Sequence, residues 1–207
     1  TGDLFDPNRA KYDLKYYVER PELIPRFLTW YSIGLAAGAA LTPVLTRYVD
    51  KRAAMMWLMV LAGLVSCGMF FVPRGQVGTM LVLNTLVGVL LGPKSPLAFS
   101  MYADCADYTE WKTGRRATAM TFAAATFSQK LGGALASAVI GWVLAAMGYV
   151  ANQAQSDASQ LGIILLLTVI PGVVALLAGL VMRAYPLDDA TLARLQAELE
   201  ARRAAAA

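Results

Sequence analysis

Residues 101–116 read MYADCADYTEWKTGRR and form a short charged segment between two long apolar stretches. The stretch before it covers residues 77–103, and the stretch after it covers residues 118–150. Each is longer than the roughly 20 mostly apolar residues that a membrane-spanning helix needs. We therefore predict a charged hairpin that joins two membrane-spanning helices.

The composition of the whole chain also indicates a membrane protein. The 207 residues are 57% hydrophobic and only 15% charged, they include no histidine, and their mean hydropathy is +0.52. An ordinary soluble domain is more charged and less apolar. Five stretches are long and apolar enough to cross a bilayer: residues 23–46, 53–72, 77–103, 118–150 and 161–184. We predict an all-α, polytopic transmembrane helix bundle.

Two polar segments flank the bundle, which covers residues 21–185. Residues 1–20 carry several charges and no apolar core, which excludes a cleavable signal sequence. Residues 186–207 contain leucines at spacings of three and four, which predicts an amphipathic tail helix: Leu192, Leu195 and Leu199. This helix is expected to lie along the membrane surface or to pack beneath the bundle, with a frayed, solvated tail as the alternative.

Basic residues gather in alternate connections and in the tail: Arg47, Lys51, Arg52, Lys112, Arg115, Arg116, Arg183, Arg194, Arg202 and Arg203. Loops rich in lysine and arginine stay on the cytoplasmic side of a membrane. We therefore predict a multi-pass protein of the cell (inner or plasma) membrane with a cytoplasmic C-terminus. This topology explains the net charge of +4 without nucleic acid as a partner.

Two lysines lie inside the apolar stretches. Lys130 comes twelve residues after Thr118, which places it roughly 18 Å into an apolar layer about 30 Å thick. Lys94 lies at a similar depth, between Pro93 and Pro96. An ammonium group there costs at least about 2.5 to 3.5 kcal/mol unless it is paired or hydrated, yet none of the five stretches contains Asp or Glu. Another part of the protein or a substrate must therefore supply the counter-charge, or the lysine must lose its proton.

The position of each lysine can be interpreted in two ways. Lys130 is predicted to act in a substrate site or in gating, and the alternative is a structural lysine. Lys94 is predicted to have a functional role too, but its long side chain could also reach water held near the two prolines.

The charged segment has two readings as well. Its charged residues could be an ordinary solvated loop that fixes topology, or a network that latches helix ends in one conformation and releases them in another: Asp104, Asp107, Glu110, Lys112, Arg115 and Arg116. No nucleophile with a base is found, so we predict no catalytic residue, no metal site and no enzyme activity. Cys67 and Cys105 are expected to be free thiols.

Small residues and prolines predict features of helix packing. Pairs four residues apart would let helix backbones approach closely: Gly34 with Gly38, Gly88 with Gly92, and Gly132 with Ala136. Pro93, Pro96 and Pro171 free backbone carbonyls, which must find another partner or line a cavity.

The segment ADCADYTEWKTGRR, followed by FSQKLGGALASAVIGWVLAAMGY, resembles the C-terminal half of the glycoside-pentoside-hexuronide:cation symporters. This melibiose permease-like family lies within the major facilitator superfamily. The resemblance also runs through the residues from Pro93 to Leu97 and through Tyr185-Pro186-Leu187. It covers nearly the whole chain from about Tyr16, and it implies helices eight to twelve of a twelve-helix transporter.

The resemblance implies transport of a glycoside, pentoside or hexuronide together with Na+ or H+ by alternating access, without a cofactor. It implies that Lys130 faces the sugar cavity on helix eleven, with Gln129 beside it, and that Tyr17, with Tyr16, ends helix seven near the outer vestibule. It further implies that Asp104, Asp107 and Arg116 form an inward-side lock with the other half of the transporter.

The chain departs from the family pattern at two places. Lys94 stands where the pattern has a small polar residue, which would favour an acidic sugar. The polar residues 2–11 replace the body of helix seven, so that residues 1–20 are expected to be its remnant in a fragment or processed form. The N-terminal six-helix half, the lipid bilayer and the sugar are the expected partners, and that half is expected to supply the cation ligands. The alternative is a non-transporting membrane remnant or interaction subunit that keeps the transporter fold.

Overall fold

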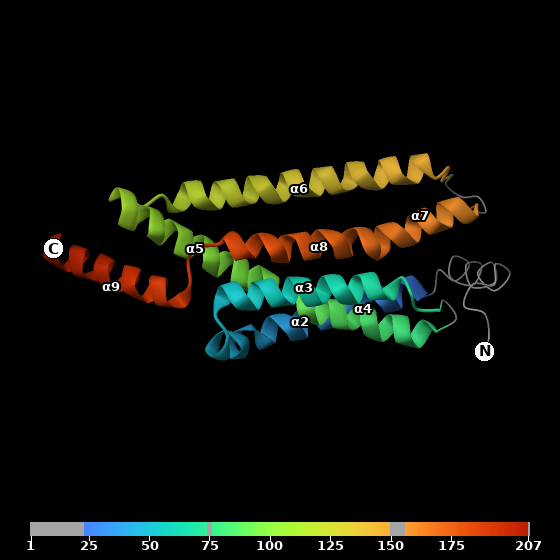
Figure 1. Ribbon diagram of the computed structural model, residues 1–207, viewed down its shortest axis with the longest axis horizontal. Coiled ribbons are helices and arrows are strands. Elements are labelled where there is room, and N and C mark those ends of the chain that lie inside the picture. Colours follow the sequence, from blue (N-terminus) through green and yellow to red (C-terminus); the bar gives the residue numbers. More distant parts are fainter. Residues whose placement is uncertain (1–22, 74–75, 150–155, 207) are drawn as a thin grey trace.

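The computed structural model describes residues 23–73, 76–149 and 156–206, and every regular element in them is a helix (Figure 1). Residues 1–20, with the predicted site residue Tyr17, lie outside this part of the chain. The elements are α2 (Leu23–Tyr48), α3 (Lys51–Met69), α4 (Val77–Leu91), α5 (Lys94–Thr113), α6 (Thr118–Ala146), α7 (Asp157–Leu167), α8 (Val169–Val181), the 3-10 turn η1 (Met182–Ala184) and α9 (Asp189–Ala206).

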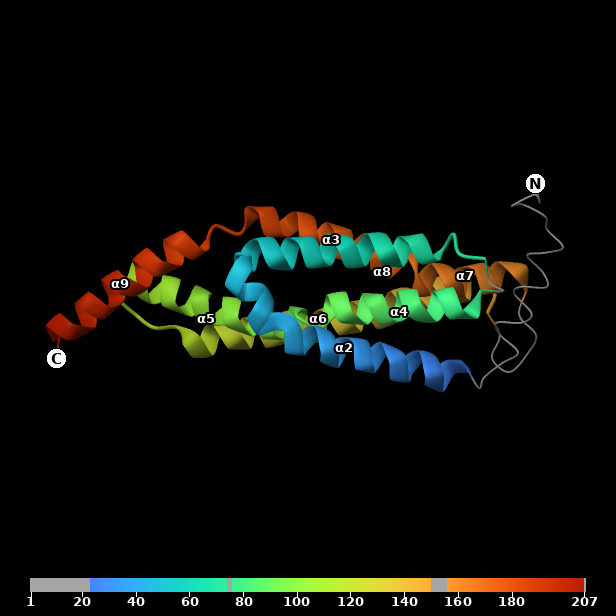
Figure 2. The same cartoon turned by 90° about the horizontal axis from the view of Figure 1, so that it is seen from below.

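Five helical segments in the described residues are long and apolar enough to cross a membrane, as the sequence predicted. Three of them are single helices, α2, α3 and α6. The third segment, Val77–Thr113, joins α4 to α5, and the fifth, Ala158–Ala184, joins α7, α8 and η1. The five run roughly along one long axis (Figures 1 and 2).

The prediction of a charged hairpin over residues 101–116 is wrong in its extent. Helix α5 continues through this segment to Thr113, so the acidic residues lie on the last turns of a helix and only residues 114–117 form the connection. Glutamate and lysine are good helix formers and continue the helix. It ends at Gly114, whose positive φ of 71° is costly for any residue with a Cβ atom.

Helices α2 and α4 pack through the two predicted glycine pairs. A Cβ atom added to Gly34 would lie 2.5 Å from the carbonyl oxygen of Thr85, and one added to Gly88 would lie 2.6 Å from that of Tyr31. Gly38 and Gly92 likewise face backbone carbonyls of the other helix. Side chains at these positions would push the backbones apart, so this close contact requires the glycines.

Helices α3 and α8 form a second close contact, which the sequence analysis missed. A Cβ atom added to Gly63 would lie 2.7 Å from the carbonyl oxygen of Gly172, and one added to Gly179 would lie 2.8 Å from a methyl group of Val60. The buried Ser66 hydroxyl donates a 2.9 Å hydrogen bond to the carbonyl of Thr168. Thr168 lies at the break between α7 and α8, three residues before the helix-breaking Pro171. The Thr168 carbonyl, which also accepts from the Gly172 amide at 3.1 Å, therefore has a second partner on α3.

Helix α6 differs from the other spans because none of its residues is buried. It contacts mainly α5 and α7 and runs along one side of the molecule (Figure 1). No heavy atom of the described residues lies within 4 Å of a Cβ atom added to Gly132. The close helix contact predicted at Gly132 and Ala136 is therefore not made in the described part of the chain.

The tail folds as predicted into a helix with one apolar stripe. The Asp188 side chain accepts a 2.8 Å hydrogen bond from the Thr191 amide at the start of α9, and this bond lowers the pKa of the Asp188 carboxyl. The leucines of the stripe, with one from the preceding linker, are buried: Leu187, Leu192, Leu195 and Leu199. Because α9 packs against α5, the alternative of a frayed, solvated tail is wrong.

Candidate functional site

The predicted functional residues that the structure describes fall into two regions. One is the end of the bundle where α3 begins, α5 ends and α9 lies, which we call the charged end (Figure 1). The other is the middle of the bundle, at the α4–α5 break and along α6. The connections and the tail that hold the basic residues all lie at the charged end, so these residues share one end of the molecule as the sequence predicted.

A buried ion pair joins two helices at the charged end. Nζ of Lys51, the first residue of α3, lies 2.8 Å from Oδ2 of Asp104 on α5. Asp104 is only 5% exposed. A buried carboxylate needs a partner, and here this partner comes from 53 residues earlier in the same chain. Sequence reasoning had assigned Lys51 to topology only.

Three further residues of the predicted network meet in a second group. Arg116 Nη2 lies 3.3 Å from Asp107 Oδ1, and Arg116 Nε lies 3.8 Å from Glu110 Oε2. Glu110 is also bound by Arg203 of α9, with nitrogen–oxygen distances of 2.7 and 3.2 Å. This paired contact raises the pKa of the Arg203 guanidinium.

The two remaining residues of the predicted network make no ion pair in the described part of the chain. The Lys112 ammonium lies 5.9 Å from the centre of the Tyr108 ring, and the Arg115 side chain is exposed. The structure thus brings together Asp107, Glu110 and Arg116, pairs Asp104 with Lys51, and leaves Lys112 and Arg115 at the edge.

The tail helix makes additional polar contacts with α5. The Trp111 indole N–H donates a 2.7 Å hydrogen bond to Glu198, which also accepts from Arg194 at 3.0 Å. These donors lower the pKa of the Glu198 carboxyl. Arg202 donates to the carbonyl of Trp111 at 3.0 Å. The sequence had predicted packing of the tail helix from its leucine stripe alone, and it had not predicted these polar contacts.

The start of α9 is tied to the start of α3. The Asp50 side chain accepts from the amide of Ala53, which caps α3, and from the amide of Asp189 at 3.1 Å. Burial, together with the nearby Asp50 carboxylate, raises the pKa of Asp189. Tyr185 lies just before this contact, with its hydroxyl 3.8 Å from the free thiol of Cys105. Burial and these neighbours raise the pKa of the Tyr185 hydroxyl.

In the middle of the bundle, the predicted substrate residues are exposed and unpaired. Lys94 is the first residue of α5, at the break that follows Gly92 and Pro93. Gln129 and Lys130 lie on α6, and both are exposed. No carboxylate in the described residues pairs with either lysine, since the described ion pairs all lie at the charged end and in the tail.

Aromatic side chains hold α6 to α5 on the charged-end side of these lysines. Phe122 of α6 stacks on Phe99 at 6.3 Å and meets the edge of Tyr102 at 5.9 Å. Beyond this cluster, α7 is the only described element that makes substantial contact with α6. Lys130 therefore lies on a stretch of helix that the described residues do not cover.

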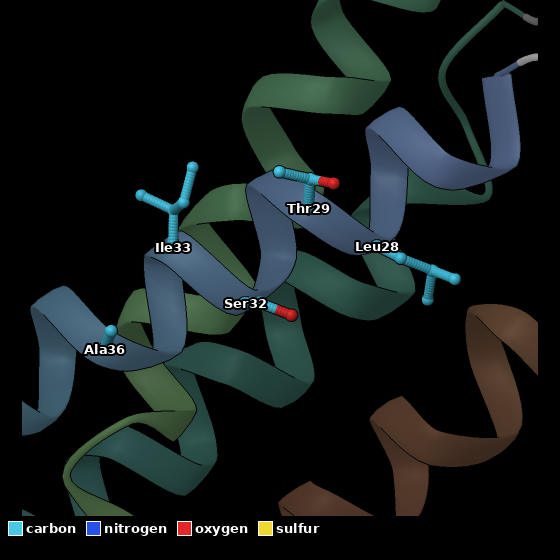
Figure 3. Close-up of a pocket in the computed structure, with 5 residues that line it drawn as sticks. All are labelled: Leu28, Thr29, Ser32, Ile33 and Ala36. Atoms are coloured by element: carbon cyan, nitrogen blue, oxygen red, sulfur yellow. The ribbon is translucent and has the colours of Figure 1, made fainter.

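A shallow groove of about 450 Å³ runs along α2 (Figure 3). All five residues that line it come from this one helix: Leu28, Thr29, Ser32, Ile33 and Ala36. The Thr29 hydroxyl already donates to the carbonyl of Pro25 at 2.8 Å. The groove is an open helix face, and Lys94, Gln129 and Lys130, the predicted substrate residues that the structure describes, do not line it.

No group of three or more His, Cys, Asp or Glu in the described residues could hold a metal ion. What the described residues do provide is a set of ion pairs at one end of a helix bundle that can span a membrane. They also provide two uncompensated cations near its middle. This arrangement suits the movement of a polar solute better than it suits chemical catalysis.

Known proteins match nearly the whole chain. The sequence model of the family described as "MFS/sugar transport protein" matches residues 9–189. The chain is 37% identical to "Inner membrane symporter YicJ" of Escherichia coli (strain K12) over 175 residues, which are 84% of this chain and 38% of that protein. It is 34% identical to "Isoprimeverose transporter" of Lactiplantibacillus pentosus over 146 residues, 70% of this chain and 30% of that protein.

A further relative is "Glucuronide carrier protein homolog" of Escherichia coli (strain K12), 26% identical over 174 residues, 83% of this chain and 37% of that protein. The chain thus spans well under half the length of these relatives. No solved structure is a significant match. The family match and these relatives are transporters, so the chain is not an enzyme. On the strength of the match to residues 9–189, the chain belongs to the MFS/sugar transport proteins, and within them to the glycoside-pentoside-hexuronide:cation symporters of the major facilitator superfamily.

Proposed function

We propose that this chain forms the C-terminal half of a transporter that moves a sugar together with Na+ or H+ by alternating access. The observation that carries the proposal is Lys130: an exposed ammonium group on a membrane-spanning helix with no buried residue and no counter-charge in the described residues. A charge in this position is stable when a polar cavity, a partner or a solute meets it. The alternative of a non-transporting remnant has no observation in its favour.

A six-helix N-terminal half is the partner that this reading requires. The chain spans 38% of the length of the first relative, which is roughly what five helices out of twelve would occupy. The uncovered α6 offers a surface for such a half. The five stretches contain no Asp or Glu, so the carboxylates that bind the coupling ion would also come from that half.

The substrate residues in this proposal are Lys130, Gln129 and Lys94, with Tyr17 at the outer end. Both lysines are cations without a carboxylate partner in the described residues, which favours a solute with a negative charge. One relative is named as a glucuronide carrier homolog, and a glucuronide is such an anion. We therefore propose an acidic sugar as the substrate.

The charged end would lie in the cytoplasm in this account, in line with the predominance of basic residues there. Asp104, Asp107, Glu110, Arg116, Lys112 and Arg115 would form the gating network, joined by Lys51. An ion pair that breaks and re-forms is a common element of such switches.

Uptake into membrane vesicles tests the proposal. Vesicles with the complete transporter should accumulate a labelled methyl glucuronide above its external concentration when a Na+ or proton gradient is imposed. An ionophore that collapses the active gradient should abolish this accumulation, and a neutral methyl xyloside or galactoside should compete less well. Absence of accumulation for the acidic and the neutral sugars under both gradients would rule out coupled sugar transport.

A further inference from the structure

The carboxylate of Glu110 has two arginine partners that come from different parts of the chain. Arg203 of the tail helix binds it through two nitrogens, at 2.7 and 3.2 Å. Arg116 of the α5–α6 connection lies 3.8 Å from the same Oε2 atom, too far for a hydrogen bond. One carboxylate thus holds the tail closely and the connection loosely.

Arg116 lies close to Asp107 but does not donate a hydrogen bond to its buried oxygen. Asp107 Oδ1 is buried and accepts no hydrogen bond in the described residues, although Arg116 is 3.3 Å away. A buried carboxylate oxygen without a hydrogen bond is costly. A small movement of Arg116 toward Asp107 and Glu110 would shorten its contacts with both, but Arg203 already donates to both oxygens of Glu110.

The other polar contacts between α9 and α5 add to the buried leucines of the apolar stripe. They include the Trp111–Glu198 hydrogen bond and the Arg202 contact with the Trp111 carbonyl. The apolar stripe of α9 is short, and the Arg116 and Arg203 side chains are about half exposed. Figure 2 shows α9 beside the last turns of α5, beyond the main body of the bundle.

We propose that α9 is a releasable strap on α5 and that Glu110 is its switch. When the strap is docked, Arg203 occupies Glu110. When the strap lifts, Arg116 takes over Glu110 and completes the pairing of Asp107. Because Asp104, on the same helix, pairs with α3, the state of the strap is linked to the position of the end of α5. This proposal needs no particular solute and does not depend on the proposed substrate.

Hydrogen exchange of the α9 amides, followed by mass spectrometry on the full chain in membranes, measures release of the strap. Arg203→Gln should speed exchange over residues 189–206 by roughly two- to fivefold, the range expected for loss of a half-exposed ion pair. Arg116→Gln should slow the same exchange, because it removes the competitor for Glu110. The double variant Glu110→Arg/Arg203→Glu should exchange more slowly than Arg203→Gln, because it restores an ion pair of opposite polarity.

Two controls make the result decisive. Gln196→Met changes an exposed side chain of α9 without altering charge or helix propensity, and it should leave exchange unchanged. The amides of α4, which packs on α2 and α3, should exchange at the wild-type rate in every variant, which shows that the bundle is folded. Unchanged exchange of α9 in Arg203→Gln would refute the strap. Unchanged or faster exchange in Arg116→Gln would refute the switch at Glu110.

Discussion

Lys130→Ala is expected to abolish uphill sugar uptake by the complete transporter while the protein still inserts into the membrane at its normal level. Lys130 has no carboxylate partner in the described residues and lies on a helix that these residues leave uncovered. If the ammonium contacts an acidic sugar, its removal loses a charge-assisted hydrogen bond. Such a loss lowers transport at limiting sugar concentration by roughly ten- to a hundredfold.

Initial rates of labelled methyl glucuronide uptake in vesicles measure this effect. Arg47→Ala is the control, because Arg47 is also a basic residue without an ion pair in the described residues, but it lies on the last turn of α2 at the charged end. It should keep uptake close to that of the wild type. Normal uptake by Lys130→Ala, at equal protein level, would remove Lys130 from the site.

Asp104→Asn is expected to cause the largest loss of stability among single changes at the charged end. It removes the partner of Lys51 and leaves that ammonium near a buried amide. Breaking a buried ion pair costs about 3 to 5 kcal/mol. Because the Lys51 side chain keeps 28% of its exposure, water can reach it, and we expect the lower part of that range, about 3 kcal/mol. Thermal unfolding in detergent should show a clearly lower midpoint.

The double variant Lys51→Met/Asp104→Leu distinguishes the contribution of the ion pair to stability from that of the surrounding packing. Apolar residues of similar size often replace a buried ion pair at little cost, so the double variant should unfold near the wild-type temperature. Glu200→Gln, on the exposed face of the tail helix, supplies a control in which an acidic residue is neutralised. A midpoint for Asp104→Asn equal to that of this control would mean that the ion pair does not stabilise the bundle.

Sequence alone predicted the helices better than it predicted their ends. Long apolar stretches define the five spans, since a bilayer demands such lengths. The charged segment after residue 103 was read as a loop because charge usually marks the end of a span. Charged residues that favour helix carry α5 on to Thr113, and only the glycine that follows ends it.

The glycine pairs show a second limit of sequence reasoning. Spacing of four indicates that a helix can be approached closely, and it was informative for α2 and α4, whose glycines meet. The same pattern in α6 has no neighbour in the described residues. A pattern on one helix does not contain the identity of the partner, which can lie elsewhere in the chain or outside it.

The partners of the charged network were beyond the reach of sequence for a related reason. Lys51 and Arg203 lie 53 and 93 residues from the carboxylates that they bind. Their charges were noted, but a basic residue near a span end has an equally good explanation in topology. Only the packing of α3 and α9 against α5 turns these residues into members of the network.

The alternating access proposed here requires that α6 borders a path that opens to each side of the membrane in turn. The most direct test uses Gln129→Cys, which keeps Lys130, in the complete transporter with Cys67 and Cys105 replaced by serine. A membrane-impermeant maleimide should label this cysteine when applied from either side, and a transported acidic sugar should slow the labelling. Labelling from neither side, or from one side only under every gradient, would contradict alternating access along α6.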